Sequence, residues 1–388
     1  MRGNPRLILA AVILTASVSA AELAWHSEQT SADSSEPPPA PGASALGPRP
    51  ALPIRLPSET EWQKILADLP KPGANRADEP VAAHFSLASA LRFLDATALH
   101  WQRERKCGSC HTNYPYLMAR AMTAGDDCQP LHIAWSFFAD RAAHWETAKP
   151  RWDTEVVATA CALAFYDAHR TGTLHPLTRK ALDWMWRLQR PDGSWDWLKC
   201  DWPPSEADDY YGIMTALLAA GLAPDRYKET QQARAGVAKI RAYIAQHPAP
   251  HLHHRLFLLW NATLWADLMT DEEKQALVRQ VLHLQKEDGS WCLPALGSWK
   301  RHDGTANDTR APGDGYATGL VAYVLRQSGL APEHPALRRA VHWLRTQQRQ
   351  SGRWFTRSLS NDRHHYLTHV GSAYAIMALA SCNALEDR

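Results

Sequence analysis

Three copies of one short pattern constrain most strongly how this chain can fold. Each copy reads Gln-x-x-x-Gly-x-Trp, and the copies span 189–195, 285–291 and 348–354. Each follows a stretch with helical hydrophobic periodicity and precedes a polar connection and a second apolar stretch. Glycine leaves a helix readily, and the tryptophan that follows can fold back as a staple between neighbouring units. The pattern therefore predicts repeated helical hairpins.

Periodicity read outward from these copies predicts six helix pairs. The outer helices are expected over about 84–103, 131–145, 178–189, 233–246, 272–285 and 336–348. The inner helices are expected over about 114–122, 154–169, 208–221, 252–268, 315–328 and 365–382. The inner stretches are rich in alanine, glycine and threonine, which suits close packing in an inner layer.

The repeated pattern resembles the QW motif of the squalene cyclase and prenyltransferase repeat family. The resemblance covers most of the chain after residue 80, and the members of that family build an α/α toroid. We therefore expect an all-α fold, an α/α toroid of six helical hairpins with QW-type repeats in a single domain. An open helical solenoid would satisfy the same pattern and stays as the alternative.

The amino-terminal residues predict export. Residues 1–21 combine Arg2 and Arg6 with a short apolar run and small residues at the end, which is typical of a signal peptide cleaved near Ala20 or Ala21. Residues 22–56 are rich in proline, serine and alanine and are expected to form a disordered tether. The toroid is then assigned to 57–388, in a protein that is periplasmic or otherwise exported.

Composition excludes some classes of function. The formal net charge of +2 lacks the excess of basic residues that is typical of nucleic-acid-binding proteins. No segment after the signal has about twenty uninterrupted apolar residues, so no further membrane span is expected. Seven cysteines are too few for a disulfide scaffold of this length.

The segment Cys107-Gly-Ser-Cys110-His111 predicts covalent attachment of a c-type haem. Each sulfur of such a motif adds to one vinyl group, and the histidine is the proximal ligand of the iron. The other interpretations are a chance cysteine pair, a disulfide or half of a zinc site. The chain has no second closely spaced cysteine pair, which weakens zinc, and haem c is attached outside the cytoplasm, which agrees with the export signal. The five other cysteines are an odd number with unknown pairing: Cys128, Cys161, Cys200, Cys292 and Cys382.

All inner helices of such a ring run the same way, so their amino termini meet at one mouth. The haem motif opens the first inner helix, which places the iron at this mouth, facing a central cavity. The second axial position is either open or filled by a side chain. The main candidates for a distal ligand are His253, His254, His364 and His365, and the weaker ones are Met118, Met122, His132 and His369. Arg357 and Arg363 could bind haem propionates or an anionic substrate group.

An acidic pair opens the third inner helix. Asp208 and Asp209 could supply a general acid, with Tyr210 and His365 as further catalytic candidates. The resemblance implies an Asp-x-Asp-Asp motif here for a terpenoid cyclase, but this chain has glutamate at the first position, Glu206. Such cyclases also need two helical domains. The zinc site of the prenyltransferase β subunits is not expected, because no Asp-x-Cys opens a matching inner helix.

Three functions follow from these features. The first is an exported haem protein that acts as a redox enzyme or transfers electrons, with a small apolar or lipid-like substrate or a redox partner. The alternative is a non-redox acid/base enzyme that uses Asp208 and Asp209 on a terpenoid, lipid or polysaccharide. The third is a binding module without catalysis. Substrate, distal ligand and oligomeric state stay open.

Overall fold

The computed structural model describes residues 52–108, 111–123, 125, 128–363 and 366–386. The predicted signal peptide, nearly all of the tether, Cys110, His364 and His365 lie outside these residues. The described residues belong to one compact unit. The described part of the chain contains helices and isolated bridges but no strand.

The helices alternate between an outer and an inner set, as the periodicity predicts. The outer helices are α3 (Leu87–Arg105), α5 (Gln129–His144), α7 (Pro176–Leu188), α9 (Gln231–Gln246), α11 (Asp271–His283) and α13 (Pro335–Thr346). The inner helices are α4 (Asn113–Thr123), α6 (Asp153–Tyr166), α8 (Asp209–Leu222), α10 (Leu252–Ala262), α12 (Gly315–Gln327) and α14 (Leu367–Ser381). Short helical turns are η1 (Asp167–Thr171), η2 (Tyr227–Glu229) and η3 (Leu293–Leu296).

Only the end of α10 differs clearly from the prediction, which extended that helix to 268. The helix unwinds into a turn after Ala262, where the Thr263 hydroxyl donates a hydrogen bond to the carbonyl of Trp260 over 2.7 Å. Threonine side chains compete with helix geometry in this way.

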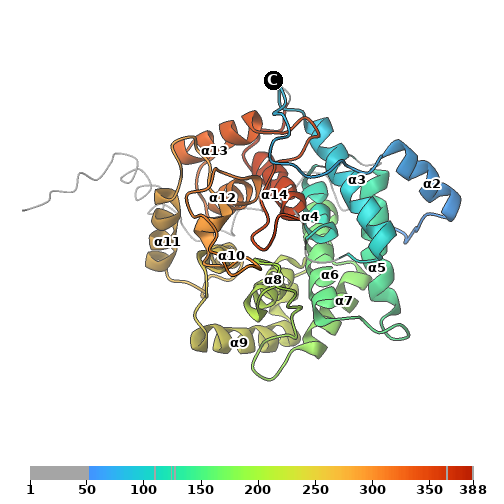
Figure 1. Cartoon of the computed structure of the whole chain (residues 1–388). Helices are drawn as coiled ribbons and strands as arrows, with labels where there is room; N and C mark the ends of the chain where they lie inside the picture. The colour runs from blue at the N-terminus through green and yellow to red at the C-terminus, as the bar shows by residue number, and fades with distance from the viewer. Residues whose placement is uncertain (1–51, 109–110, 124, 126–127, 364–365, 387–388) are drawn as a thin grey trace, which may run out of the picture. The chain divides into compact units, whose positions relative to one another are not determined.

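The six inner helices form a closed ring. Each one packs against the next along the chain, and α14 packs against both α12 and α4 (Figure 1). The outer helices surround this ring (Figure 1). The fold is therefore an α/α toroid of six helical hairpins, and the open solenoid is excluded.

Inner and outer helices differ in which residues they bury. In α8 every residue from Tyr210 to Ala220 is buried, whereas α13 buries a stripe at helical spacing. Glycines bring α12 and α14 into backbone contact, because a Cβ on Gly319 would lie 2.5 Å from the amide nitrogen of Ala375. Small residues thus let the inner layer pack closely.

The three Gln-x-x-x-Gly-x-Trp segments are turns of the same construction. Gly193, Gly289 and Gly352 have φ of 97°, 91° and 91°, which only glycine adopts without strain. Each tryptophan is fully buried and donates its indole N–H to a backbone carbonyl ten residues earlier. The pairs are Trp195 to Met185, Trp291 to Val281 and Trp354 to Leu344.

The glutamine of each turn ties the turn to the next outer helix. Its Nε2 donates to the carbonyl of the turn's own glycine and to a carbonyl of the neighbouring hairpin. The second acceptors are Gly236 for Gln189, Ala336 for Gln285 and Ser86 for Gln348. Because Ser86 caps α3, the third turn joins the last outer helix to the first and closes the outer layer.

One helix precedes the ring and lies outside the predicted pairs. Helix α2 (Glu59–Asp68) begins at Ser58 with a capping box to Glu61, and Trp62 and Ile65 pack on α3 and α5. Ser-x-x-Glu before apolar residues is the sequence signal for this helix.

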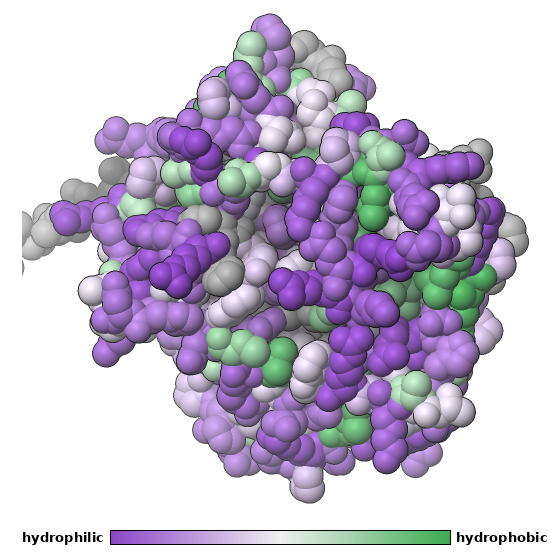
Figure 2. Space-filling view, turned by 45° about the vertical axis from the view of Figure 1, so that its right-hand side comes forward, coloured by the Kyte–Doolittle hydropathy of each residue, from purple (hydrophilic) through white to green (hydrophobic). Residues whose placement is uncertain are grey.

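The described surface is polar where Figure 2 shows it, with only separated hydrophobic patches on that face. Among the described helices, none combines the length and apolar character that a membrane crossing requires.

Candidate functional site

His111 lies at the mouth of the ring, between α3 and α4, and is buried among aromatic rings. Tyr366, which precedes α14, stacks on its imidazole with centroids 4.6 Å apart. Trp101 of α3 meets it edge-on at 4.7 Å, and Trp202 from the α7–α8 connection lies at 5.9 Å. The starts of α4 and α14 therefore meet at one mouth, as predicted, and the α7–α8 connection reaches the same place through Trp202.

The imidazole of His111 is oriented by its neighbour. Its Nδ1 lies 2.8 Å from the Thr112 hydroxyl, which in turn lies 3.4 Å from Nδ1 of His369 on α14. Burial lowers the pKa of His111 to about 4, so the ring is neutral at neutral pH. In the tautomer whose Nδ1–H donates to the Thr112 hydroxyl, Nε2 carries the lone pair that can bind a metal.

Cys107 follows the end of α3, where Lys106 adopts a left-handed conformation. Its thiol is partly exposed and borders a cavity of about 20 Å³ that Phe137 and Trp152 also line. His111 borders a second cavity of about 20 Å³. The donor set fits a covalent haem, but pockets for ligands of drug size measure about 300–1,000 Å³. The macrocycle would need the space that Trp202 and Tyr366 fill.

Two chain segments cover the mouth. The first, 198–208, contributes Trp202 and Glu206 beside His111, and the second, 357–363, contributes Ser358 and Ser360. The connection that precedes α12 ties them together: His302 contacts the carbonyl of Asp201 and Arg301 donates to that of Ser358. Arg357 binds Asp362 through two hydrogen bonds of 2.7 Å, so its guanidinium is already paired.

The acidic pair at the start of α8 is engaged within the chain. Asp208 caps the helix by accepting the amide hydrogen of Tyr211, and its Oδ1 lies 3.3 Å from Nε2 of His254. Burial raises the pKa of Asp208, but His254 and the Tyr211 amide outweigh burial and leave the pKa below its usual range. Asp209 forms an ion pair of 2.6 Å with Lys199. Asp208 is therefore ionised and acts as a base more readily than as an acid.

Tyr210 and the two described histidines of the first His-His pair point in different directions. The buried hydroxyl of Tyr210 has no partner among the described residues, and burial raises its pKa to about 12. Nε2 of His253 lies 2.9 Å from the Tyr316 hydroxyl, inside the ring. The ring of His254 is nearly perpendicular to that of His253. Of the described distal-ligand candidates, His369 is the one linked to His111, through Thr112.

The axis of the ring is filled by buried tyrosine side chains from the inner helices. Tyr374 of α14 meets Tyr211 of α8 from the opposite side of the ring, and its ring lies 5.2 Å from that of Tyr316 on α12. Tyr114 of α4 lies 3.5 Å from the Cys161 sulfur of α6. All four tyrosines are fully buried. These side chains occupy the space where a central cavity was expected. The sequence signal for this filling is a tyrosine within the first residues of α4, α8 and α12.

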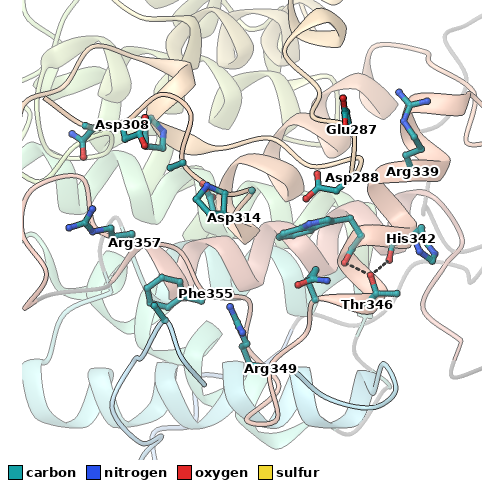
Figure 3. A pocket seen from close by; sticks show the side chains of 18 of the residues that line it. Glu287, Asp288, Asp308, Asp314, Arg339, His342, Thr346, Arg349, Phe355 and Arg357 are labelled. Atoms are coloured by element: carbon teal, nitrogen blue, oxygen red, sulfur yellow. Dashed lines mark hydrogen bonds between the residues drawn. The ribbon is translucent and has the colours of Figure 1, made fainter. Parts of the chain in front are cut away.

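A large groove runs along α13 and reaches the mouth, because Ser358 borders both. Its volume is about 1240 Å³, and Figure 3 shows charged side chains around it. It is built by 287–294, 307–314 and the continuous stretch 335–359 that contains α13, together with Ala77. Sequence reasoning missed it, because no single motif contains its residues.

Among the described residues, no three histidine, cysteine, aspartate or glutamate side chains are grouped so that they could hold a metal ion.

Comparison with known proteins gives structural likenesses without sequence matches. The sequence matches no protein-family model and no curated protein. A possible GH105 family member from Klebsiella pneumoniae aligns with a TM-score of 0.48 and 11% identity, over 87% of this chain and 98% of that chain. A polysaccharide lyase aligns at 0.47 and 12%, over 77% and 98%. An ent-copalyl diphosphate synthase from Streptomyces platensis aligns at 0.27 and 16%, over 77% and 50%.

Proposed function

We propose that this chain is an exported c-type haem protein that transfers electrons at the mouth of its toroid. Cys107 and Cys110 would hold the macrocycle, and His111 would be the proximal ligand. The observation that carries the proposal is the place of His111 in the Cys-x-x-Cys-His segment: a buried imidazole whose Nδ1 lies 2.8 Å from the Thr112 hydroxyl. Its turns are similar to those of the squalene cyclase and prenyltransferase repeat family, which would serve here as a scaffold.

Bound haem would supply reversible one-electron transfer. The residues around His111 have defined tasks in this proposal. Thr112 fixes the ring orientation, and Trp101 packs edge-on against the imidazole, whereas Trp202 and Tyr366 would have to move aside for the macrocycle. Electron transfer is favoured over turnover of a bulky substrate because tyrosines fill the ring axis. The signal peptide (1–21) and the tether (22–56) would place the protein in the compartment where haem c is attached.

The proposal is tested by expressing the full chain with a haem-maturation system and comparing His111→Ala with His302→Ala. His302 is an exposed histidine near the mouth and outside the motif. We expect both proteins to carry covalent haem by mass, but only His111→Ala to lose the spectrum of a histidine-ligated iron. A parent protein without covalent haem would overturn the proposal.

A second candidate function is acid/base catalysis, and one observation favours it. Asp208 and the fully buried His254 lie 3.3 Å apart, which gives a carboxylate–imidazole pair able to accept a proton. Asp208→Asn would abolish such an activity while haem content stays normal. If Asp208→Asn converted each substrate of the parent protein at the parent rate, acid/base catalysis by Asp208 would be excluded.

A further inference from the structure

We propose that the surface around Trp152 docks an acidic protein that carries electrons, with the tip of an aliphatic side chain at the centre of the contact. This surface, called the Trp152 notch below, surrounds a cavity of about 20 Å³. Its apolar members besides Trp152 are Phe137 and Leu198, and its cations include Lys106 and Arg151. The naming of the partner as an electron carrier rests on the proposed function, whereas the docking itself does not.

Trp152 is the exposed member of an otherwise buried set. Among the tryptophans that the structure describes, it alone is exposed, with a fractional exposure of 44%. It precedes α6 as the N-cap residue, and its side chain makes no capping hydrogen bond. A tryptophan left in water forfeits the large stabilisation that its burial provides, and tryptophan is enriched at the energetic centres of protein interfaces. Its exposure therefore marks a surface that a partner covers.

The lining of the notch is positively charged. Its charged members are the cations of Lys106, Arg141 and Arg151 and the carboxylate of Glu155, so three positive charges meet one negative charge. Arg141 and Glu155 form an ion pair of 2.6 Å, which leaves Lys106 and Arg151 uncompensated. Both are exposed, and the Arg151 guanidinium donates to the Lys106 carbonyl over 2.6 Å, which holds it beside the notch.

The charged residues next along the chain keep this sign. Arg105 and Lys149 are exposed and Asp153 is half-buried, so together they add one further positive charge. Oδ2 of Asp153 accepts the amide hydrogen of Asp196, whose own carboxylate pairs with Arg190 at 2.8 Å. An excess of cations attracts a surface rich in carboxylates, and complementary charge sets both the rate of encounter and the choice of partner.

The shape of the notch favours a protein over a membrane. A cavity of about 20 Å³ admits a group of the size of a water molecule or a methyl group, but not an aromatic ring. The tip of an aliphatic side chain can enter it between Trp152 and Phe137. Binding to a bilayer surface scales with the apolar area that is buried in it, and the notch offers one exposed aromatic ring.

The notch borders the haem-attachment segment. Cys107 lines its cavity, and a Cβ on Gly108 would lie 2.6 Å from a ring carbon of Phe138, which lines the cavity too. A partner docked on Trp152 would therefore lie next to the thioether of Cys107. The contact would serve transfer of one electron between the partner's cofactor and the haem iron, which changes between its ferric and ferrous states, with no bond or proton exchanged.

The test uses a dye-labelled helical peptide as the probe, with a central leucine and with glutamates three and four residues to either side, which places them on one face. The full chain, produced with and without haem maturation, is titrated into the peptide, and binding is read from fluorescence anisotropy. We expect both forms to bind and added salt to weaken binding. Lysines in place of the glutamates, or serine in place of the leucine, should weaken binding about tenfold or more.

Two variants of the chain locate the contact. Trp152→Ala should weaken binding about tenfold or more, because the centre of the interface is lost. Lys106→Gln/Arg151→Gln should weaken it about threefold to tenfold and reduce its dependence on salt. The matched control is Arg234→Gln/Lys239→Gln, which removes the same two charges from the exposed face of α9 and should bind like the parent protein.

The docking proposal is overturned if the parent does not bind the peptide, if the lysine peptide binds equally well, or if the control variant loses affinity like the notch variants. Binding to phosphatidylglycerol vesicles that Trp152→Ala abolishes would also overturn it, because the notch would then serve a membrane. A chain that binds the peptide but carries no covalent haem would contradict the proposed function and leave the docking intact. A haem-loaded chain that does not bind the peptide would contradict the docking alone.

Discussion

The Gln-x-x-x-Gly-x-Trp turns and the Cys-x-x-Cys-His segment are both short motifs, but the chain treats them differently. In the third turn, the Gln348 amide donates to Ser86 and Gly352 and the Trp354 indole donates to Leu344. At the mouth, His111 has one ring nitrogen engaged by Thr112 and three aromatic rings around it. A motif whose polar atoms are all used internally serves the fold, whereas one that keeps a donor atom available points to a ligand.

The largest expected effect concerns the mouth. Cys107→Ala/Cys110→Ala should abolish covalent haem completely, because both thioether bonds are lost. Cys200→Ala, which removes an exposed thiol outside the motif, should keep the full haem content. The readout is haem that stays with the protein after denaturing extraction. If the double variant retained covalent haem, the contrast drawn between the two motifs would not hold.

Next in size is the third turn. A Cβ on Gly352 would lie 2.1 Å from the carbonyl oxygen of Ser89, so Gly352→Ala adds a backbone clash to the strain of a positive φ. Gly329 has φ of 95° and open space around it, and Gly329→Ala measures the strain alone, about 1–2 kcal/mol. We expect Gly352→Ala to lower the free energy of unfolding by about 1–3 kcal/mol more in urea titrations. If both variants lost the same free energy of unfolding, the contact between Gly352 and α3 would relax around the added methyl group.

A buried titratable group, Asp314, caps α12 next to the second turn, where its amide donates to the carbonyl of Trp291. Burial raises its pKa to about 6. A folded pKa above the ordinary value means that the protonated carboxyl stabilises the fold below about pH 4, and this contribution is lost as the pH rises through 6. A shift of about two units corresponds to about 3 kcal/mol.

Unfolding free energies measured from pH 4 to pH 7 should therefore fall less steeply in Asp314→Asn than in the parent protein. Asp271→Asn, at an exposed position in the first turn of α11, should keep the parent slope. Identical slopes for the parent and Asp314→Asn would mean that the Asp314 carboxyl is ionised over the whole range from pH 4 to pH 7.

The smallest effect is expected at Thr112. Thr112→Val removes the hydrogen bond to Nδ1 of His111, worth about 1 kcal/mol of stability, and should shift the haem midpoint potential. Thr215→Val is the control, because that hydroxyl donates to the Tyr211 carbonyl of its own helix. A shift in both variants, or in neither, would show that Thr112 does not orient the imidazole.

Most of the fold could be predicted from sequence, because it is encoded locally. Glycine and tryptophan at fixed spacing set each turn, and hydrophobic periodicity set the helices between turns. Closure was argued from resemblance and count; the structure shows its physical basis in the bond from Gln348 to Ser86. Helix α2 was missed although its capping box at Ser58 was visible.

The site was less predictable, because side chains from distant segments decide it. The start of α4 and the chain beside Trp202 and Tyr366 do lie at one mouth. The filling of the axis by Tyr211 and Tyr374 depends on which face of each inner helix points inward, which a run of buried residues does not reveal. The groove depends on 287–294, 307–314 and 335–359 meeting beside Ala77, which no local pattern specifies.

The absorption spectrum of the exported, purified chain tests the haem proposal most directly, in the ferric and ferrous states and with carbon monoxide. We expect a Soret band and the sharp ferrous bands of a haem c that the protein retains under denaturing conditions. A chain matured in the presence of haem that shows no Soret band would contradict the assignment of Cys107, Cys110 and His111.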